Sequence, residues 1–303
     1  MSGCPNDKVR IELQMKKLEM AKVEPLIDLA VAEDLGQGDV TSELLFPDDD
    51  RATAHLVSRE EIIVCGMGLA AEVFRRYDPR LTLKPHIRDG ETGHIRSRLG
   101  TVRGPLRPML SAERVVLNFM QRLSGIATTT NKFVQAIRGT KARIYDTRKT
   151  LPGWRMLEKY AVRCGGGCNH RVGLYDGVLI KDNHLAQLGR HFQPRLRKIV
   201  EEARRRKHVQ FVAVEVDHVD DQLNYVLEVP GIDIVLLDNM GQWQLQHAVE
   251  MRDRMCGKGN RPLLEASGNI NLYNVAAVAR SGVDRIAVGA LTHSSGIVDI
   301  GMD

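Results

Sequence analysis

Cationic side chains gather in residues 146–183, a segment that is rich in glycine and poor in carboxylates. Several of them directly follow short apolar runs typical of strands, so we expect rigid elements to carry them. The segment is therefore predicted to bind a small, strongly anionic molecule, although a merely solvated basic surface is the alternative. The cationic residues are Arg148, Lys149, Arg155, Lys159, Arg163, His170, Arg171 and Lys181.

Two later segments place glycine where the backbone could approach an anion. Ser267, Gly268 and Asn269 stand before a predicted helix, and Gly289 follows Val288 at the end of a predicted strand. Backbone N–H groups in such loops, together with the positive end of a following helix, favour phosphate. We expect these loops to form a phosphate cup, but Ser267 to Asn269 would also serve as a plain helix N-cap.

Acidic residues end two further apolar runs, and we expect them opposite this cup. Glu215 and Asp238 could hold ribose hydroxyls there, or a Mg²⁺ ion that a diphosphate carries in. A phosphate site, sugar-binding acids and a basic cluster together indicate a phosphosugar and a second anionic reactant.

Short β-type runs alternate with helix-length stretches from residue 142 onward, and this alternation predicts a parallel sheet. Polar residues recur after nearly every run, which favours an α/β barrel. Residues 271–280 are predicted to form a helix that stops at Ser281 and Gly282. No GxGxxG follows the first run and no GxxxxGK[ST] occurs, which excludes the usual dinucleotide and P-loop signatures. The runs are residues 142–145, 177–180, 211–214, 232–237, 262–264 and 285–288.

The chain before residue 115 has a different pattern, typical of an α+β domain. We predict a helix at residues 13–33, strands within 51–64 and 81–107, and a long helix beginning at Ser111. Gly36 and Gly38 resemble a phosphate loop, but no strand precedes them, so a turn is the better interpretation.

Composition excludes several classes of protein. With 303 residues and 43% hydrophobic content, the chain can build one or two domains. No apolar run approaches the roughly 20 residues of a membrane span, so we expect a cytoplasmic protein with no membrane partner. Five scattered cysteines fit a reducing compartment. Cys164, Cys168 and His170 could be zinc ligands, but a fourth ligand at usable spacing is missing.

The net charge of +5 leaves nucleic acid open as a partner, but the distribution of charge argues against it. The dense basic run at residues 204–208 follows an amphipathic stretch and is interpreted as the cationic last turn of a helix. Aromatic residues make up 5% of the chain and do not interleave with this run. We therefore predict no nucleic-acid partner; a polyanion-binding module based on this run is the alternative from another class.

Several motifs, in their order and spacing, resemble the quinolinate phosphoribosyltransferase family. They are DTRKTLPGWR, GGGCNHRVGLYDGVLIKDNH, EASGN and RIAVGALTHS, with EDLGQGDVTS and ERVVLNFMQRLSGIAT upstream. The resemblance implies an α/β fold in which an N-terminal α/β sandwich domain (residues 1–116, joined by 294–303) packs on an incomplete, six- to seven-stranded α/β barrel (residues 117–293). It also implies a homodimer with shared active sites.

The activity implied is transfer of phosphoribosyl from phosphoribosyl diphosphate to quinolinate, with Mg²⁺. Decarboxylation then gives nicotinate mononucleotide, CO₂ and diphosphate, in NAD synthesis. Within enzymes, the alternatives are a barrel aldolase with Lys181 as a Schiff base, and a paralogue of the same fold that acts on another pyridine or anion.

The resemblance also implies roles for single residues. Around the pyridine dicarboxylate it places Arg148, His170, Arg171 and Lys181, with Arg114 from the partner subunit. At the diphosphate it places Lys149 and Lys181, and at the ribose and its Mg²⁺ it places Glu215 and Asp238. At the 5-phosphate it places the loops of Ser267, Gly268 and Asn269 and of Val288 and Gly289. Leu151, Trp154 and Asn269 depart from the family pattern, which affects only the expected loop shape.

Overall fold

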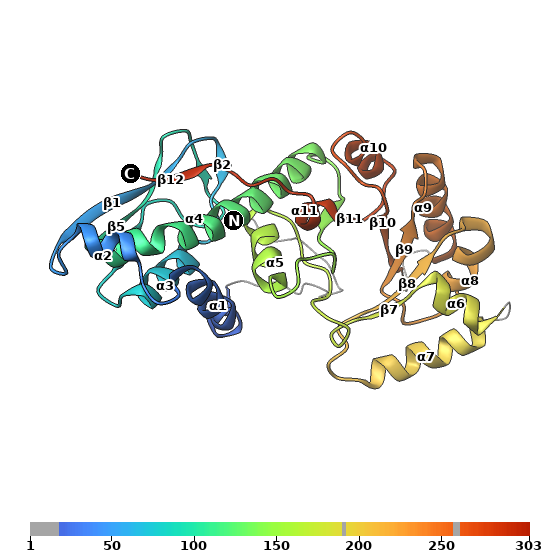
Figure 1. The fold of residues 1–303 in the computed structure, drawn as a ribbon. Coiled ribbons are helices and arrows are strands. Elements are labelled where there is room, and N and C mark those ends of the chain that lie inside the picture. Colours follow the sequence, from blue (N-terminus) through green and yellow to red (C-terminus); the bar gives the residue numbers. More distant parts are fainter. Residues whose placement is uncertain (1–17, 190–191, 257–260) are drawn as a thin grey trace. The chain divides into compact units, whose positions relative to one another are not determined.

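The computed structural model describes residues 18–189, 192–256 and 261–303 (Figure 1). They form two compact units. Among the described residues, the antiparallel-sheet unit contains residues 18–132, Lys149–Gly167 and Leu291–Asp303. The parallel-sheet unit contains Phe133–Arg148 and Cys168–Ala290.

A four-stranded sheet in the order β12-β1-β5-β3 organises the antiparallel-sheet unit. Its strands are β1 (Arg51–Ser58), β3 (Thr82–Pro85), β5 (Arg98–Pro105) and β12 (Ile300–Met302), and β2 (Ile62–Ile63) pairs separately with β4 (Thr92–Gly93). The strands predicted within residues 51–64 and 81–107 are therefore confirmed. Because β12 pairs with β1, the C-terminal residues belong to the same sheet as the first strand.

The helices here are η1 (Met20–Lys22), α1 (Glu24–Leu35), α2 (Val40–Leu45), α3 (Met67–Tyr77), α4 (Leu106–Ala136), α5 (Arg155–Cys164) and α11 (Ala290–His293). The helix predicted at residues 13–33 begins only at Glu24, where Pro25 favours a helix start, and residues 13–17 lie outside the described chain. The long helix begins at Leu106 rather than Ser111. Gly36 and Gly38 lie in a turn, as predicted, and Asp39 caps α2 by accepting the N–H of Ser42 at 3.0 Å.

Six parallel strands form the second sheet, and all six predicted runs are confirmed. The strands are β6 (Arg143–Tyr145), β7 (Val178–Ile180), β8 (Val212–Val216), β9 (Ile234–Asp238), β10 (Leu263–Ser267) and β11 (Arg285–Ala287). Their order is β6-β11-β10-β9-β8-β7, so two strands that are consecutive in sequence lie at opposite ends. This is the incomplete α/β barrel that the sequence predicts.

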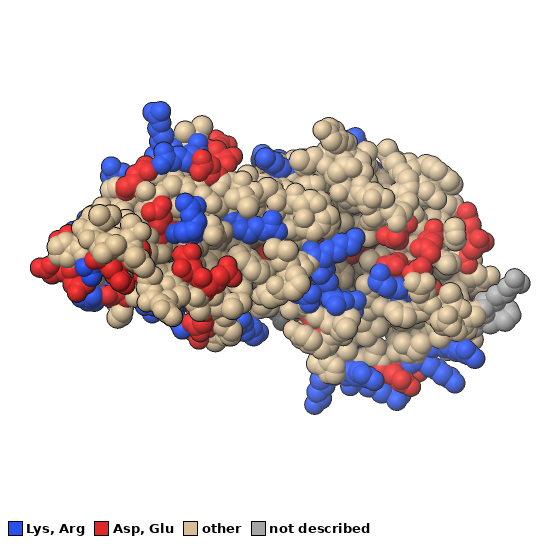
Figure 2. Space-filling model, viewed as in Figure 1, with Lys and Arg blue, Asp and Glu red and all other residues tan. Residues whose placement is uncertain are grey.

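Helices connect these strands: α6 (Asp182–Leu188), α7 (Gln193–Arg205), η2 (Val219–Leu223), α8 (Asn224–Leu227), α9 (Gln242–Cys256) and α10 (Val275–Arg280). The basic run does end a helix, since Arg204 and Arg205 form the last turn of α7. Figure 2 shows basic side chains interrupted by acidic ones along α7. No described helix combines the length and the apolar character needed to span a membrane.

One face of the parallel sheet carries both the core and polar strand ends. Phe211, Ala213, Ile234 and Leu236 pack together as a buried cluster. Side chains alternate between the two faces of a strand, so the next residue on this face comes two positions later. Those later positions hold Lys181, Glu215, Asp238 and Glu265, following Leu179, Ala213, Leu236 and Leu263.

Candidate functional site

A buried aspartate, Asp146, follows β6 and holds the neighbouring segment of the site in place by hydrogen bonds. Asp146 has no exposed surface and accepts hydrogen bonds from the backbone N–H of His170 and the side-chain amide of Asn169, both at 2.7 Å. Cys168 continues the pairing, because its N–H donates to Ile144 and its carbonyl accepts the N–H of Asp146. The segment that carries His170 and Arg171 is therefore held against β6 by buried hydrogen bonds.

Two arginines, Arg148 and Arg171, lie near each other next to this segment. Arg171 is buried and donates from Nη1 to the carbonyl of Gly177 at 2.9 Å. Burial lowers the pKa of Arg171, and the positive charge of nearby Arg148 lowers it further. The carboxylate of Asp176 offsets these two effects only in part, so a further anion would relieve the repulsion between the two cations. Arg148 and Arg171 thus supply the charge and the planar donors that a carboxylate needs.

The ring of His170 is buried, and both of its nitrogens lie near protein groups. Nδ1 accepts the N–H of Arg171 at 2.8 Å, which places the proton of a neutral ring on Nε2. Nε2 lies 3.4 Å from Oε1 of Glu265, and the ring meets Phe211 edge-on. In this structure His170 orients the backbone of Arg171, and its expected contact with a substrate stays a prediction.

Glu265 and Arg285 form a buried ion pair beneath His170. Arg285 donates from Nε to Oε2 of Glu265, and its guanidinium lies 3.5 Å from the centre of the Tyr145 ring. Burial by itself would raise the pKa of Glu265, but Arg285 and then His170 outweigh it and hold the pKa at about 2. The carboxylate is therefore ionised at neutral pH, and its charge is balanced within the protein.

The acids predicted at the other strand ends also come together. Glu215 is buried on β8, with Oε2 lying 3.8 Å from Nζ of Lys181, whose side chain is 52% exposed. Burial raises the pKa of Glu215; Lys181 lowers it, and Asp238 raises it again. Burial likewise raises the pKa of Asp217, followed by repulsion from Asp182 and Asp238. We call Glu215, Asp217 and Asp238 the acidic group.

The expected phosphate cup is a loop without a helix directly behind it. α10 begins at Val275 with Asn274 as its N-cap, so the interpretation of Ser267 to Asn269 as an N-cap is wrong. The segment is ordered instead by side-chain amides: Asn269 donates to Oδ1 of Asn239 at 3.0 Å, and Asn274 donates to the carbonyl of Asn269 at 3.0 Å. These bonds compete with helix formation immediately after the strand.

Gly268 is required by this loop. Its φ is +89°, and a Cβ there would lie 2.1 Å from Oδ1 of Asn239. Asp238 also pairs in register with Ser267. Asp238 therefore lies beside the predicted cup rather than opposite it, because β9 and β10 are neighbouring strands. Val288 and Gly289 follow β11, and the N–H of Val288 donates to the carbonyl of Tyr145.

Arg114 and Lys149 belong to the other compact unit, as do Arg155, Lys159 and Arg163 of the predicted cationic segment. Arg114 is exposed on α4, and Lys149 is exposed with its carbonyl accepting the hydroxyl of Thr292 at 2.7 Å. The remaining predicted residues, namely Arg148, His170, Arg171, Lys181, Glu215, Asp238, Ser267, Gly268, Asn269, Val288 and Gly289, lie in the parallel-sheet unit.

The carboxylates of the acidic group offer the oxygen ligands that a hard cation prefers. They also repel one another, and a bound cation would relieve that repulsion. These carboxylates do not form a ready-made cage: among the described residues, three ligand atoms come within 4.8 Å of one another only at Cys65, Asp89 and Cys164. Glu215 and Asp238 therefore fit a Mg²⁺ ion that arrives with a phosphorylated reactant and keeps water or phosphate oxygens.

Sequence reasoning missed the roles of Glu265, Arg285 and Asp146. The sequence places Glu265 after an apolar run but assigns it no role of its own. The alternation of side chains along a strand could have revealed it, because Glu265 lies two positions before Ser267 and so on the same face of β10. An acid at such a buried position needs a partner, and Arg285 is the register partner on the adjacent strand.

Comparison with known proteins gives a consistent result. The model of the quinolinate phosphoribosyl transferase C-terminal domain matches residues 126–303, and that of the N-terminal domain matches residues 39–124. A carboxylating nicotinate-nucleotide pyrophosphorylase of Mycobacterium leprae is 43% identical over 285 residues, covering 90% of this chain and 94% of the relative.

Further relatives agree in sequence and in structure. A probable carboxylating nicotinate-nucleotide pyrophosphorylase of Bacillus subtilis is 38% identical over 295 residues, covering 96% of this chain and 93% of that protein. The solved nicotinate-nucleotide pyrophosphorylase from Francisella tularensis superimposes with a TM-score of 0.85 at 38% identity, covering 96% of this chain and 98% of that one.

Proposed function

This chain belongs to the quinolinate phosphoribosyltransferase family, and from that membership we propose how its residues perform the reaction. The chain is a phosphoribosyltransferase of NAD synthesis. It joins quinolinate to the phosphoribosyl group of phosphoribosyl diphosphate, and it releases diphosphate and CO₂ to give nicotinate mononucleotide.

The observation that carries the assignment of the acceptor is the proximity of Arg148 and Arg171 in a partly buried setting. Quinolinate bears two adjacent carboxylates, and each desolvated anion costs several kcal/mol unless it is paired. Arg148 and Arg171 bind these carboxylates, and Lys181 adds a mobile point charge. His170 and Glu265 act beneath them by fixing the backbone that carries Arg171.

The acidic group and the loop after β10 bind the phosphosugar. Glu215 and Asp238 hold the ribose, while Ser267, Gly268 and Gly289 approach the 5-phosphate through their backbone N–H groups. A Mg²⁺ ion held by Glu215 and Asp238, directly or through water, would neutralise charge on the departing diphosphate. Lys149 and Lys181 face that diphosphate.

The chemical steps need no protein nucleophile. The pyridine nitrogen attacks the anomeric carbon as the bond to diphosphate breaks, and the carboxylates of Glu215 and Asp238 stabilise the cationic sugar. The pyridinium product then accepts the electron pair left when the carboxylate next to the nitrogen departs as CO₂. Protonation of that ring carbon completes the product.

An assay with quinolinate, phosphoribosyl diphosphate and Mg²⁺ tests this function. Stoichiometric CO₂ and nicotinate mononucleotide are the expected products, and omitting phosphoribosyl diphosphate should abolish both. CO₂ release without the sugar donor, or no release with both substrates, would contradict the assignment.

The active enzyme is a homodimer with shared sites in the cytoplasm. Support for sharing comes from the family membership and from the exposure of Arg114 on α4. Inactive Arg114→Ala and Lys181→Ala proteins should regain activity when mixed, because one site of each heterodimer then has both residues intact. Tagged variants that are shown to co-purify but stay inactive would rule out a shared site.

A further inference from the structure

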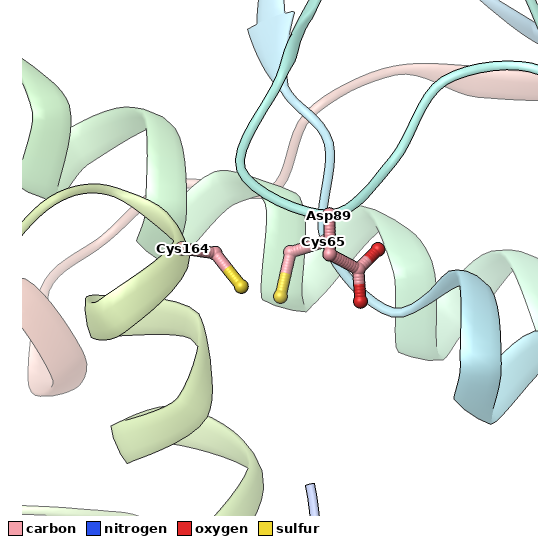
Figure 3. Close-up of side chains that lie close together, drawn as sticks. All are labelled: Cys65, Asp89 and Cys164. Carbon is pink, nitrogen blue, oxygen red and sulfur yellow. The ribbon is translucent and has the colours of Figure 1, made fainter. Parts of the chain in front are cut away.

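Two cysteines and an aspartate converge in the antiparallel-sheet unit (Figure 3). The ligand atoms of Cys65, Asp89 and Cys164 all lie within 4.8 Å of one another. Cys65 is completely buried shortly after β2, and Cys164 is the partly buried last residue of α5. Asp89 lies in the turn before β4. Three segments that are distant in the sequence thus direct ligand-type atoms at one point, and the proposed reaction uses none of them.

The carboxylate of Asp89 is held in place by groups adjacent to both cysteines. Its Oδ1 accepts the backbone N–H groups of Gly66 and Met67, each at 3.0 Å. Its Oδ2 accepts the hydroxyl of Tyr160 at 2.7 Å, one helical turn before Cys164. Metal-binding carboxylates are usually oriented by such additional hydrogen bonds. The position of Asp89 is therefore fixed relative to Cys65 on one side and to Cys164 on the other.

The kind of donor decides which ion fits. Two sulfur atoms and one carboxylate select Zn²⁺ or a similar thiophilic ion over Mg²⁺ or Ca²⁺, which prefer oxygen alone. Three protein ligands with one position left for water is a common zinc arrangement. We propose that Cys65, Cys164 and Asp89 form a binding site for a thiophilic divalent cation such as Zn²⁺.

Burial keeps the Cys65 sulfur protonated in the metal-free protein. Burial raises the pKa of the Cys65 thiol well above its usual value, and the contact with Cys164 raises it further. Binding of a dication converts coordinating thiols to thiolates, so each ion bound by both cysteines releases two protons. Metal affinity at this site should therefore increase as the pH rises.

Cobalt is a direct probe, because thiolate ligands give Co²⁺ an intense charge-transfer absorption in the near ultraviolet. Full-length protein is reduced, treated with a chelator, freed of both reagents without air, and titrated with Co²⁺. We expect this absorption to saturate at one Co²⁺ per chain, to disappear when Zn²⁺ is added, and to accompany an increase in melting temperature.

Variants assign the signal to this cluster. Cys164→Ser should abolish the absorption, and Asp89→Asn should weaken binding while leaving the sulfur signal in place. Cys256→Ser is the matched control, because Cys256 is a partly buried thiol at the end of α9 in the other unit; it should bind Co²⁺ like the unaltered protein. Circular dichroism checks that each variant is folded.

Three results would overturn the proposal. Fully reduced protein could show no charge-transfer absorption, or the absorption could persist in folded Cys164→Ser, or it could vanish in Cys256→Ser. A protein whose Cys65 and Cys164 join in a disulfide in air, yet bind no Co²⁺ when reduced, would show that the pair is a redox pair and not a metal site.

Discussion

Glu215 and Glu265 are two buried glutamates at the same level of one sheet, yet their surroundings act on them in opposite directions. Both pair in register with Leu236, from either side of β9. Burial raises the pKa of each. At Glu265, Arg285 and His170 outweigh that effect and hold the pKa at about 2. At Glu215, Lys181 compensates only in part and Asp238 adds repulsion, so the pKa is raised.

The difference indicates that Glu265 has a structural role and that Glu215 belongs to a binding surface. Glu265 has its counter-charge within the chain, on Arg285, and lies 3.4 Å from the His170 ring that accepts the N–H of Arg171. Glu215 and its neighbours have an excess of negative charge, which a cationic ligand would neutralise. Perturbed carboxylates of this second kind are typical of functional sites, whereas the first kind is typical of structural ion pairs. The two glutamates should therefore respond oppositely when their charges are removed.

The largest effect is expected for Glu265→Gln. Removing the carboxylate leaves Arg285 buried without its counter-charge, and breaking such a pair costs about 3–5 kcal/mol of unfolding free energy. Urea denaturation at neutral pH measures the loss. Asp220→Asn is the control, because its carboxylate pairs with His247 while 75% exposed, and it should change stability by less than about 0.5 kcal/mol.

The same pair has a defined pH dependence. The folded-state pKa of Glu265 lies below its ordinary value, so its contribution to stability is present above that ordinary value. It should be lost as the pH falls toward about 2. Replacing both partners together, as Glu265→Leu with Arg285→Met, should recover most of the stability. A double variant as unstable as Glu265→Gln would mean that the ion pair is not the cause.

An intermediate effect is expected for Gly268→Ala. The added Cβ would lie 2.1 Å from Oδ1 and 2.9 Å from the backbone nitrogen of Asn239, at a φ of +89°. Gly139→Ala is a matched control, since Gly139 has a φ of +87° but nothing within 4 Å of the added carbon. Both variants carry backbone strain of about 1–3 kcal/mol, but only Gly268→Ala should weaken affinity for phosphoribosyl diphosphate. Equal binding by the two variants in calorimetry would exclude the loop from the phosphate site.

The smallest effect, and one of opposite sign, is expected for Glu215→Gln. Because the folded-state pKa of Glu215 is raised, its favourable contribution is complete below the ordinary carboxyl pKa and is lost as the pH rises through the raised value. Gln stays neutral throughout. The variant should therefore melt at a slightly higher temperature than the unaltered protein at pH 7, lose that advantage in acid, and lose activity. A lower melting temperature at pH 7 would contradict the comparison.

Most of the fold follows from local patterns. All six strands of the parallel sheet coincide with short β-branched runs, because buried parallel strands are apolar on both faces. The basic end of α7 was predictable from its charge pattern. Helix starts were less predictable: α1 begins at Glu24 and α4 at Leu106, each with a proline (Pro25 and Pro108) in its first turn, where proline is tolerated.

The candidate site was predictable in its residue types but not in its partners. Lys181 and Glu215 come together because β7 and β8 are adjacent, and sequence alone does not give strand order. Asp238 lies beside Ser267 for the same reason. The loop after β10 stays irregular because Asn269 and Asn274 bond to each other instead of continuing into a helix. Such contacts depend on positions in space that periodicity does not encode.

The proposed match between two guanidinium groups and the two carboxylates of quinolinate sets the preference for this acceptor. Its most direct test compares kcat/KM for quinolinate and for nicotinate, following mononucleotide formation, in the unaltered enzyme, Arg171→Gln and the surface control Arg205→Gln. Leaving a buried cation unpaired costs on the order of 2–5 kcal/mol, so quinolinate should be preferred by roughly 30-fold or more. Arg171→Gln should lose most of that preference and Arg205→Gln none. Equal use of both acids by the unaltered enzyme, or a preference that survives Arg171→Gln, would contradict the account.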